Sequence, residues 1–380
     1  MPASAKPVII ALYPIPDTIP NYDQLLDKYD VLEYQLLTPS DLKADMQKEP
    51  YRSAVAIFGS YPGFNPIGGL EEKSLIDALP PNLKVIGLCS AGYDGYDLQH
   101  LSSRNIKLCN VPVDKYVAMD VADCALWHVL SGMRKFNSWD RLTRTNRTTT
   151  NNSHTFKIRD EVRNDFVKSE EKQEGFAFGH VYHGQPVRRV SGKKCVIYGY
   201  GLIGKAVVER MIAIGMDVNV VVRDKSKYQD TNVHFYSSSS PGEVQKATLE
   251  ANVLVVCLPG GKGTLECINK QTFDNVSSDC VIVNIGRGSC IDTEALKAAV
   301  ESGKVSHVGL DVFPKEPIIE PYWLDEKDVN SSSNKFYTTS VTPHLGSSTV
   351  DTLEFASFTC IDNIMTGIET GKFKNSLHDQ

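Results

Sequence analysis

Residues 195–206 read CVIYGYGLIGKA, and this stretch decides the fold of the chain. It opens with a short apolar run of the kind that forms a buried strand, and its glycines follow in G-x-G-x-x-G spacing. The residues beyond it predict a helix over Lys205–Ile214 and a second parallel strand over Val218–Val222. A strand, this turn, a helix and a further strand form the context in which the motif binds a dinucleotide. An ordinary glycine-rich turn in a parallel sheet is the plainer alternative.

The three glycines have separate tasks in such a loop. Gly199 permits the tight turn, Gly201 lets the backbone approach a pyrophosphate, and Gly204 lets the helix pack closely on the strand. The phosphates would lie at the helix N-terminus, where Leu202 and Ile203 lead into the helix. The sequence therefore predicts a dinucleotide site at this loop.

Length and composition are those of a soluble globular protein with about two domains. The chain has 380 residues, of which 41% are hydrophobic and 23% are charged. The formal net charge of −6 leaves no basic footprint for nucleic acid. Apolar runs such as Val253–Leu258 are far too short to span a bilayer, so we expect no membrane partner.

The cysteines indicate a reducing compartment. There are nine, an odd number, and none stands in C-x-x-C spacing, which argues against both a disulfide framework and a metal site. Several, such as Cys89, Cys195 and Cys257, lie in apolar runs, as buried free thiols do. The N-terminus lacks the apolar core of a signal peptide. We therefore expect a cytoplasmic protein without a bound metal.

The order of elements predicts an α/β protein with two Rossmann-like or flavodoxin-like domains on parallel sheets, because short β-like runs alternate with amphipathic stretches. The expected strands are Val8–Leu12, Val31–Leu36, Ala54–Phe58, Val85–Cys89, Ile106–Asn110, Cys195–Tyr198, Val218–Val222, Val253–Leu258, Val281–Asn284, Val308–Val312 and Phe336–Thr342. Further expected helices are Tyr22–Lys28, Lys73–Leu79, Ala118–Met133, Asp292–Ser302 and Phe355–Ile368.

A change in composition suggests the domain boundaries. Asn137–Gln185 is rich in Thr, Asn, Arg, Lys and Glu, and we interpret it as a long connection with a partly disordered insertion. We assign residues 1–130, completed by 345–380, to a substrate domain and residues 131–344 to an NAD(P)-binding domain. Ligands favour the carboxyl ends of parallel strands, so we expect the active site in the cleft between the domains.

Three charged side chains stand just beyond strand ends in the second half of the chain. Arg287, Glu316 and His344 each have a glycine or proline neighbour there, and parallel strands would let all three point into one cleft. A histidine can supply the proton that a carbonyl oxygen gains when its carbon accepts a hydride. A carboxylate beside it favours the imidazolium, and an arginine can bind a carboxylate through a fork-shaped contact. Together the three suit the reduction of a 2-oxo acid.

Each of these residues also has a plainer interpretation when taken alone. Arg287 could be a surface arginine, Glu316 a turn residue before Pro317, and His344 a structural histidine. Their shared setting favours the catalytic interpretation. The other histidines lack that setting and are expected to be structural: His100, His128, His154, His180, His183, His234, His307 and His378.

In these residues the chain resembles the D-isomer-specific 2-hydroxyacid dehydrogenases, the family of D-glycerate, glyoxylate/hydroxypyruvate, 3-phosphoglycerate and formate dehydrogenases. The resemblance runs from about Lys84 to Thr366. It rests on residues 83–94, 110–112, 121–123, 199–204, 251–259, 284–288, 311–317 and 343–346.

The resemblance implies a role for each site residue. Arg287 would bind substrate, Glu316 would support the histidine, and His344 would be the acid/base. The N–H groups of Ala91 and Gly92 would bind the substrate carboxylate, as small residues beyond a strand end can. The implied cofactor-binding residues, with Asp311 near the nicotinamide, are Gly199, Gly201, Leu202, Ile203, Gly204, Arg223, Leu258, Pro259, Ile285, Gly286 and Asp311.

The sequence departs from the family pattern in ways that bear on the cofactor. Val222 occupies the strand end where NAD-preferring members carry an acid that bonds the ribose 2′-OH. Arg223 follows and can pair with a 2′-phosphate. We therefore expect NADP(H) to be favoured, with NAD(H) as the alternative if Asp224 takes the acidic position. Asp123 stands where a glutamate is usual, and the insertion is longer than common.

We conclude from the sequence that the chain interconverts a small 2-oxo acid and a D-2-hydroxy acid, with a glyoxylate or hydroxypyruvate type of substrate favoured and a homodimer expected. One rival is a dinucleotide-sensing protein like the corepressors that share this fold and its three charged residues. A second rival is a formate-type dehydrogenase, which Glu316 disfavours because that branch carries a glutamine there.

Overall fold

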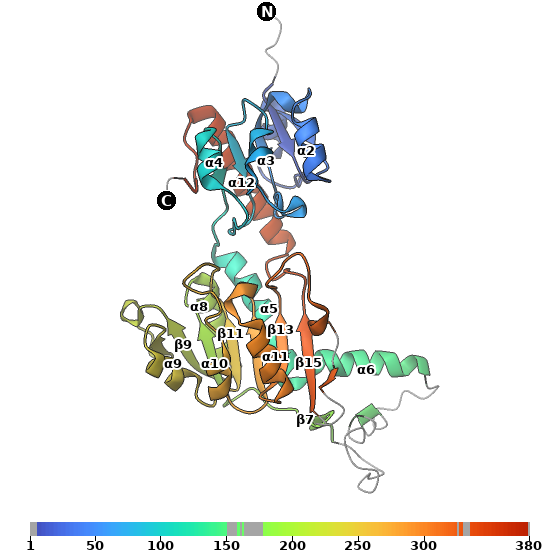
Figure 1. Ribbon diagram of the computed structural model, residues 1–380, viewed down its shortest axis with the longest axis vertical. Helices are drawn as coiled ribbons and strands as arrows, with labels where there is room; N and C mark the ends of the chain where they lie inside the picture. Colours follow the sequence, from blue (N-terminus) through green and yellow to red (C-terminus); the bar gives the residue numbers. More distant parts are fainter. Residues whose placement is uncertain are drawn as a thin grey trace, which may run out of the picture. The chain divides into compact units, whose positions relative to one another are not determined.

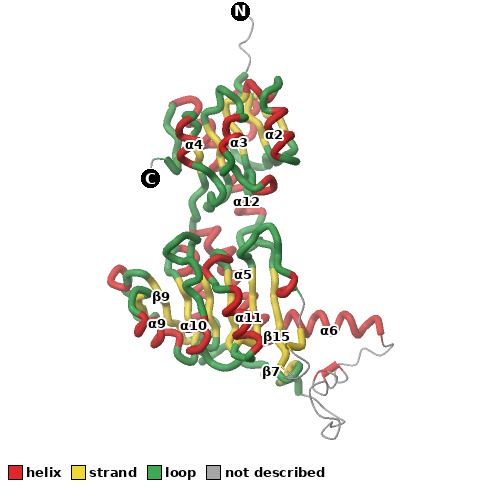
Figure 2. The backbone as a smooth tube through the Cα atoms, in the orientation of Figure 1, coloured by secondary structure: helices red, strands yellow, loops and turns green. Residues whose placement is uncertain are grey.

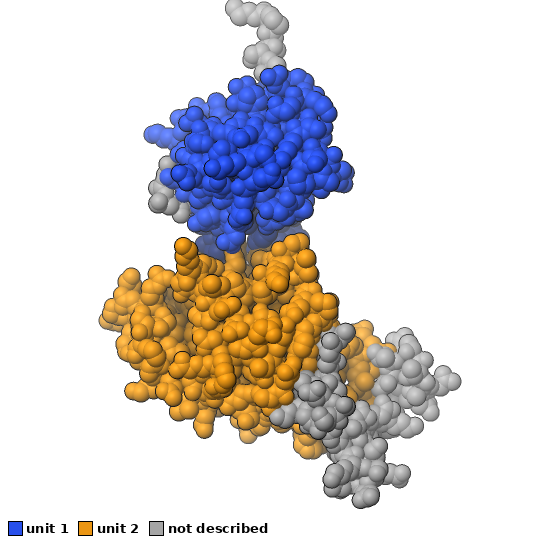
Figure 3. Space-filling model, viewed as in Figure 1, with its two compact units in different colours: residues 1–114, 348–380 blue, residues 115–347 orange. Residues whose placement is uncertain are grey.

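The computed structural model describes residues 6–149, 158–159, 162, 178–324, 327–329 and 335–378, and it contains two compact units (Figures 1 and 3). Unit 1 is formed by both ends of the chain, residues 1–114 and 348–380, and unit 2 by the continuous stretch 115–347. Of the expected insertion over Asn137–Gln185, residues 150–157, 160–161 and 163–177 lie outside the described residues.

Unit 1 is a five-stranded, wholly parallel sheet with strand order β2-β1-β3-β4-β5. This is the flavodoxin-like order, in which helices must cover both faces. Apolar side chains accordingly form two cores, one under α2, α3 and α4 and the other under α1 and α12. The elements are β1 Val8–Ala11, α1 Tyr22–Lys28, β2 Asp30–Glu33, α2 Pro39–Asp45, β3 Ala54–Phe58, α3 Lys73–Asp77, β4 Val85–Gly87, α4 Leu98–Ser103, β5 Lys107–Cys109 and α12 Val350–Thr370.

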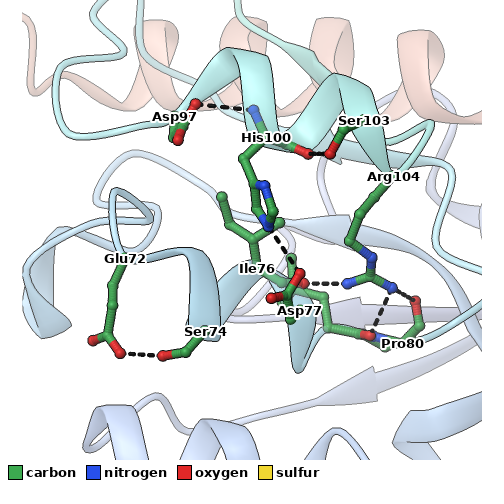
Figure 4. Close-up of polar contacts among 10 residues, drawn as sticks. Glu72, Ser74, Ile76, Asp77, Pro80, Asp97, His100, Ser103 and Arg104 are labelled. Carbon is green, nitrogen blue, oxygen red and sulfur yellow. Dashed lines mark hydrogen bonds and ion pairs between the residues drawn. The ribbon is translucent and has the colours of Figure 1, made fainter.

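Two side chains, His100 on α4 and Arg104 directly after it, connect this helix to α3, as Figure 4 shows. The Arg104 guanidinium donates hydrogen bonds to the carbonyls of Ile76 and, at 3.4 Å, Pro80. His100 Nε2 lies 2.8 Å from the Asp77 carboxylate. The last carbonyls of a helix have no partner within it, so Arg104 satisfies groups at the end of α3.

Unit 2 is an eight-stranded sheet with strand order β10-β9-β8-β11-β12-β13-β15-β14, parallel except for the edge strand β14. The direction of strand succession reverses between β8 and β11, which is where doubly wound sheets bind ligands. The elements are α5 Lys115–Arg134, α6 Phe136–Thr149, β6 Val181–Tyr182, β7 Gln185–Pro186, β8 Lys194–Tyr198, α8 Leu202–Ala213, β9 Asp217–Val222, β10 His234–Ser237, α9 Pro241–Thr248, β11 Val253–Val256, α10 Lys270–Asn275, β12 Cys280–Asn284, α11 Thr293–Glu301, β13 Val305–Leu310, β14 Lys327–Val329 and β15 Lys335–Val341.

Helices cover both faces of this sheet, and Figure 2 shows them around the row of strands. On one face, α9, α10 and α11 pack over a core of strand residues such as Val196, Leu254 and Ile282. On the other face, α5 lies against β12, β13 and β15 and also against α8. Because side chains alternate along a strand, neighbours such as Val281 face α5 instead.

The structure corrects three expectations. The polar stretch after residue 136 begins with the helix α6, not with a connection. The long helix α5 belongs to unit 2, so the boundary falls near residue 114, not 130, because its apolar side rests on the second sheet. The polar composition of Asp325–Lys335 predicts a loop, but β14 within it pairs antiparallel with β15. The sequence analysis did not predict the short helices α2, α4, α9 and α10 or the strand β10.

Candidate functional site

The glycine-rich loop joins β8 to α8 at the point where the strand order reverses. Gly199 has a φ of +99°, and a Cβ atom there would lie 2.9 Å from the Cys257 carbonyl oxygen. At Gly204 a Cβ would overlap the Gly199 carbonyl, whereas nothing lies within 4 Å of the same position on Gly201. The loop thus has a packed inner side and an open outer side, which fits the close approach of a pyrophosphate to the helix N-terminus.

Leu202 and Ile203 lie in the first turn of α8, which begins three residues earlier than the sequence pattern indicates. The exits of β11 and β12 lie beside this loop. Ile285 is buried and donates its N–H to the Val256 carbonyl. The chain at Gly286 runs so close to Leu258 that a Cβ would lie 2.5 Å from the Leu258 oxygen. Pro259, the next residue along, is exposed.

The end of β9 agrees with the register from which a preference for NADP(H) is expected. The strand ends at Val222, which is buried, and Arg223 follows it on the surface. The Asp224 carboxylate accepts hydrogen bonds from the N–H and the hydroxyl of Ser226, at 3.1 and 2.6 Å. Asp224 is therefore engaged in the turn that follows the strand. These bonds, the hydroxyl first, lower the pKa of its carboxyl group.

The two nearby lysines are less available than the sequence alone suggests. Lys225 Nζ lies 2.8 Å from Glu243, and Lys227 Nζ lies 3.9 Å from Asp224. Each has an acidic partner, so Arg223 is the residue of this segment on which binding of a phosphate would chiefly depend.

Arg287 stands on the turn that follows β12, and Asn284 shapes this turn from both sides. The buried Asn284 side chain donates to the Arg287 carbonyl at 2.9 Å and accepts from the Gly286 N–H at 3.1 Å. The Arg287 guanidinium donates to the Gly286 carbonyl at 2.9 Å. At Gly288 a Cβ would overlap the backbone of Phe313, so the turn after β12 is packed against the loop after β13.

Glu316 and His344 are in direct contact. His344 Nδ1 lies 2.7 Å from Glu316 Oε2, and the other Glu316 oxygen accepts the Phe313 N–H at 2.9 Å. The Glu316 carboxylate thus joins the loop after β13 to the loop after β15. His344 has a φ of +52°, a left-handed conformation that is uncommon for a residue other than glycine. The Nδ1 contact leaves its Nε2 as the ring nitrogen that can face a substrate.

The charges around the pair raise the pKa of His344 and lower the pKa of Glu316. For His344 the hydrogen bond with Glu316 is the largest cause; burial opposes it, and the negative charges of Glu316 and Asp311 add to it. For Glu316 burial alone would raise the pKa, but the bonds from His344 and the Phe313 N–H, with the charges of His344 and Arg287, outweigh it. The pair therefore favours an imidazolium beside a carboxylate, with Arg287 close enough to act on both.

Asp311, at the end of β13, holds the loop that carries His344. Its carboxylate is 2% exposed. It accepts hydrogen bonds from the Thr342 hydroxyl at 2.7 Å and from the N–H groups of Leu345 and Gly346 at 2.8 and 2.9 Å. The sequence suggested a place near the nicotinamide for Asp311; its observed contacts lie on this loop. Asn284 and Thr342, both just at strand ends, are positioning residues whose individual roles the sequence analysis missed.

Ala91 and Gly92 lie in unit 1, in the loop after β4. The Ser90 hydroxyl donates to the Gly92 carbonyl at 2.8 Å, and Asn110 donates to the Ala91 carbonyl at 2.8 Å. Both carbonyls are thereby fixed. In the part of the chain that the structure describes, no acceptor lies on the N–H groups of Ala91 and Gly92. This geometry is suited to binding an anion.

Among the residues that the structure describes, no group of three or more His, Cys, Asp or Glu side chains could hold a metal ion. Within the same residues no helix combines the length and apolar character needed to cross a membrane.

Comparison with known proteins gives one consistent family. Residues 161–346 match the D-isomer specific 2-hydroxyacid dehydrogenase, NAD binding domain. YGL185C of Saccharomyces cerevisiae, provisionally named a 2-hydroxyacid dehydrogenase, is 34% identical over 348 residues, covering 88% of this chain and 86% of that protein. Glyoxylate reductase 1 of the same yeast is 26% identical, covering 80% of this chain and 75% of that protein.

A solved structure shares the fold over almost the whole chain. It is the NADPH-dependent glyoxylate/hydroxypyruvate reductase of Sinorhizobium meliloti in complex with NADP and malonate. The TM-score is 0.68 at 22% identity, covering 98% of this chain and 97% of that one.

Proposed function

Because this chain belongs to the D-isomer specific 2-hydroxyacid dehydrogenase family, we propose that it reduces small 2-oxo acids to D-2-hydroxy acids through Arg287, Glu316 and His344. It is a hydride-transferring oxidoreductase that uses a nicotinamide dinucleotide. The names of its relatives favour a substrate of the glyoxylate or hydroxypyruvate type.

The reduced nicotinamide supplies the hydride when it is bound. The chain's own residues would do the rest of the chemistry. His344 donates a proton from Nε2 to the carbonyl oxygen, and Glu316 stabilises the imidazolium through Nδ1. Arg287 binds the substrate carboxylate in a planar, charge-assisted contact. The N–H groups of Ala91 and Gly92 in unit 1 would bind a carboxylate.

The observation that carries this proposal is the 2.7 Å contact between His344 and Glu316. The hydrogen bond from Glu316 raises the pKa of His344 above its ordinary value, so the histidine stays protonated further toward neutral pH. A proton donor for carbonyl reduction needs this property. The structural histidine His100 also contacts a carboxylate, Asp77, but that contact joins two helices of unit 1, whereas His344 and Glu316 meet in loops that follow strands.

The direct test is a panel of small 2-oxo acids assayed with NADH and NADPH. We expect turnover of glyoxylate or hydroxypyruvate, with a rate of reduction that falls as the pH rises through the raised pKa of His344. A dinucleotide-sensing protein of the same fold would bind the dinucleotide with little turnover. The relatives carry the names of enzymes and do not favour that alternative. Dinucleotide binding without turnover of any acid in the panel would overturn the proposal.

We further propose that NADPH is the preferred cofactor. Supporting this are the position of Arg223 directly after β9 and the bonds that engage Asp224 in its own turn. Arg223→Ala should lower kcat/KM with NADPH by roughly ten- to a hundred-fold and leave NADH almost unchanged, because a hydrogen bond to a charged group is worth about 1.5–3 kcal/mol. Asp224→Ala is the matched variant. A larger loss with NADH than with NADPH in Asp224→Ala would reverse the assignment.

Two finer expectations concern assembly and location. We propose a homodimer, and the exposed Trp127 and Phe136 on α5 and α6, with 43% and 49% of their surface accessible, support a protein contact there. A monomeric mass in sedimentation at micromolar concentration would refute it. We also propose the cytoplasm as its compartment; none of the nine cysteines, all within the described residues, forms a disulfide, which fits a reducing environment, and cell fractionation is the test.

A further inference from the structure

A continuous chain of polar side chains crosses the apolar layer between α5 and the sheet of unit 2. It begins at Lys135, which is 1% exposed, and reaches Thr338 on β15 at 3.1 Å. Thr338 lies 2.7 Å from His307 Nδ1, and His307 Nε2 lies 2.9 Å from Ser340. Ser340 in turn lies 2.7 Å from His128 Nδ1.

This chain of hydrogen bonds ends at the loop that carries His344. His128 Nε2 lies 3.1 Å from the Thr342 hydroxyl, which lies 2.7 Å from the Asp311 carboxylate. Asp311 also holds the N–H groups of Leu345 and Gly346, the residues that follow His344. A buried lysine is thus linked to a buried aspartate across roughly four strand residues, or about 13 Å.

The two strands and the helix contribute to this chain with regular spacing. Residues 307, 309 and 311 share one face of β13 and its exit, and residues 338, 340 and 342 share one face of β15 and its exit. The register pairs His307 with Thr338 and Gly309 with Ser340. Residues 128 and 132 share one side of α5, because they are four residues apart, and Lys135 directly follows the last residue of that helix.

Two glycines make room for the histidine rings. A Cβ at Gly309 on β13 would lie 2.9 Å from the His128 Cβ, and a Cβ at Gly132 on α5 would lie 2.7 Å from His307 Cδ2. The rings therefore lie where the helix and the sheet approach most closely. An apolar pair of side chains would fill such a layer at lower cost, because buried polar groups must all find partners.

Chemistry at the Asp311 end fixes the direction of every hydrogen bond. The carboxylate can only accept, so the one hydroxyl proton of Thr342 points to Asp311, and His128 must donate from Nε2. A neutral ring then accepts at Nδ1, so Ser340 donates to His128. By the same reasoning His307 donates from Nε2 and accepts at Nδ1 from Thr338, which accepts from the Lys135 ammonium. Each group donates one bond toward Asp311.

Burial keeps both rings neutral, as this pattern requires. Loss of solvation lowers the pKa of His128 to about 4, although the charge of Asp311 opposes it. The pKa of His307 lies well below its ordinary value, first through burial and then through the charges of Lys135 and His128. The charged or titratable groups that act on the two rings are therefore Asp311, Lys135 and the rings themselves.

We propose that His128, His307 and the hydroxyls between them form a one-directional hydrogen-bond chain that orients Asp311 and, through it, the loop of His344. The residues of this hydrogen-bond chain are positioning residues, since they reach the loop of His344 through Asp311 and through Thr342, whose carbonyl accepts the His344 N–H at 3.0 Å. This inference rests on the proposed function for its consequence in catalysis, but its geometry can be tested without turnover.

The first test reads the tautomers directly in the full-length protein. Long-range ¹H–¹⁵N spectra of ¹⁵N-labelled protein, assigned with His128→Gln and His307→Gln, should show both rings as neutral Nε2–H tautomers between about pH 5 and 8. An Nδ1–H tautomer on either ring, or titration of either ring in that range, would overturn the proposal. Absence of 2-oxo acid turnover would leave this result intact, so the two failures are distinguishable.

The second test compares two replacements of His128. A glutamine amide can accept from Ser340 and donate to Thr342, whereas leucine can do neither. We expect His128→Leu to lower kcat about ten-fold, or about 1.4 kcal/mol in the barrier, with unchanged affinity for NADPH. His344 should titrate at a lower pH in the rate profile, because a disturbed Asp311 carboxylate supports the imidazolium less. His128→Gln should keep both kcat and the pH at which His344 titrates near their wild-type values. Equal losses in the two variants would indicate packing alone and would refute the chain.

A substitution at the Lys135 end of the hydrogen-bond chain tests the proposal even if the His128 variants misfold. Thr338→Val preserves shape and removes the hydroxyl between Lys135 and His307; Thr339→Val, the buried neighbour on the opposite face of β15, is the matched control. Thr338→Val should shift the His307 ¹⁵N signals, and Thr339→Val should not. Identical spectra for both variants would contradict the proposal.

Discussion

Replacing Glu316 by glutamine tests the acid/base pair at its most specific point. The amide removes the negative charge and keeps an oxygen that can still accept the His344 Nδ1–H. It can satisfy only one of the two donors that Glu316 now serves, His344 and the Phe313 N–H. The pKa of His344 should therefore fall, and the imidazolium should be lost at a lower pH.

The size of the effect follows from the 2.7 Å contact. A hydrogen bond to a charged group is worth about 1.5–3 kcal/mol. The side chains of His344 and Glu316 are 45% and 35% exposed, so solvent screens the pair and the lower end applies. About 1.5 kcal/mol corresponds to roughly ten-fold in the rate of reduction. This factor should appear only at a pH where wild-type His344 has begun to lose its proton.

The assay is the ratio of wild-type to Glu316→Gln kcat/KM for 2-oxo acid reduction, measured across the pH range in which both are folded. The ratio should approach one at low pH, where His344 is protonated in both proteins, and rise to roughly ten at high pH. A ratio that is flat across pH would refute the electrostatic role of Glu316. Thermal unfolding is the control, because the unmatched Phe313 N–H can cost about 1–3 kcal/mol of stability.

Three further substitutions test neighbouring parts of the site. His344→Ala should lower the rate of reduction by about 10²–10⁴-fold with little change in dinucleotide affinity, and near-normal turnover would exclude it as the acid. Arg287→Lys should raise KM strongly and also lower kcat, because an ammonium cannot form the planar fork; an unchanged KM for every active substrate would place the substrate arginine elsewhere. Gly288→Ala should destabilise the protein by about 1–3 kcal/mol, since its methyl group would overlap the Phe313 backbone, whereas Gly242→Ala, with open space around it, should not.

The sequence predicted the elements that have strong local signals. Parallel strands buried on both faces are short apolar runs, and the runs that become β3, β9 and β12 were located to within a residue at each end. The residues after β12, β13 and β15 also led to the prediction of Arg287, Glu316 and His344 as site residues, and the last two are in contact. The sequence analysis did not predict the short helix α9 or the polar helix α6, because neither has a comparably strong apolar pattern.

The buried polar chain shows why the remainder could not be predicted. His128 lies on an apolar helix and His307 in an apolar strand, so each alone resembles an ordinary core histidine. Their partners Thr338 and Ser340 are common strand residues. Only the register between β13 and β15, together with the packing of α5, brings them into line. The short polar runs Ser306–His307 in β13 and Thr338–Ser340 in β15, both buried, were the available signal.

Unit 1 is formed by both ends of the chain, and this determines the order in which its parts can fold during synthesis on the ribosome. Its sheet is complete once residue 109 has been made, but Ile361 and Ile364 of α12, which cover one face of that sheet, follow only after the 233 residues of unit 2. At roughly 5–20 residues per second, the ribosome needs about 10–50 s for that interval. In this interval unit 2 can fold, whereas apolar strands of unit 1 such as β4 remain uncovered on one face. The nascent chain is therefore most exposed to aggregation through its first hundred residues, and chaperones that act during translation would matter most there.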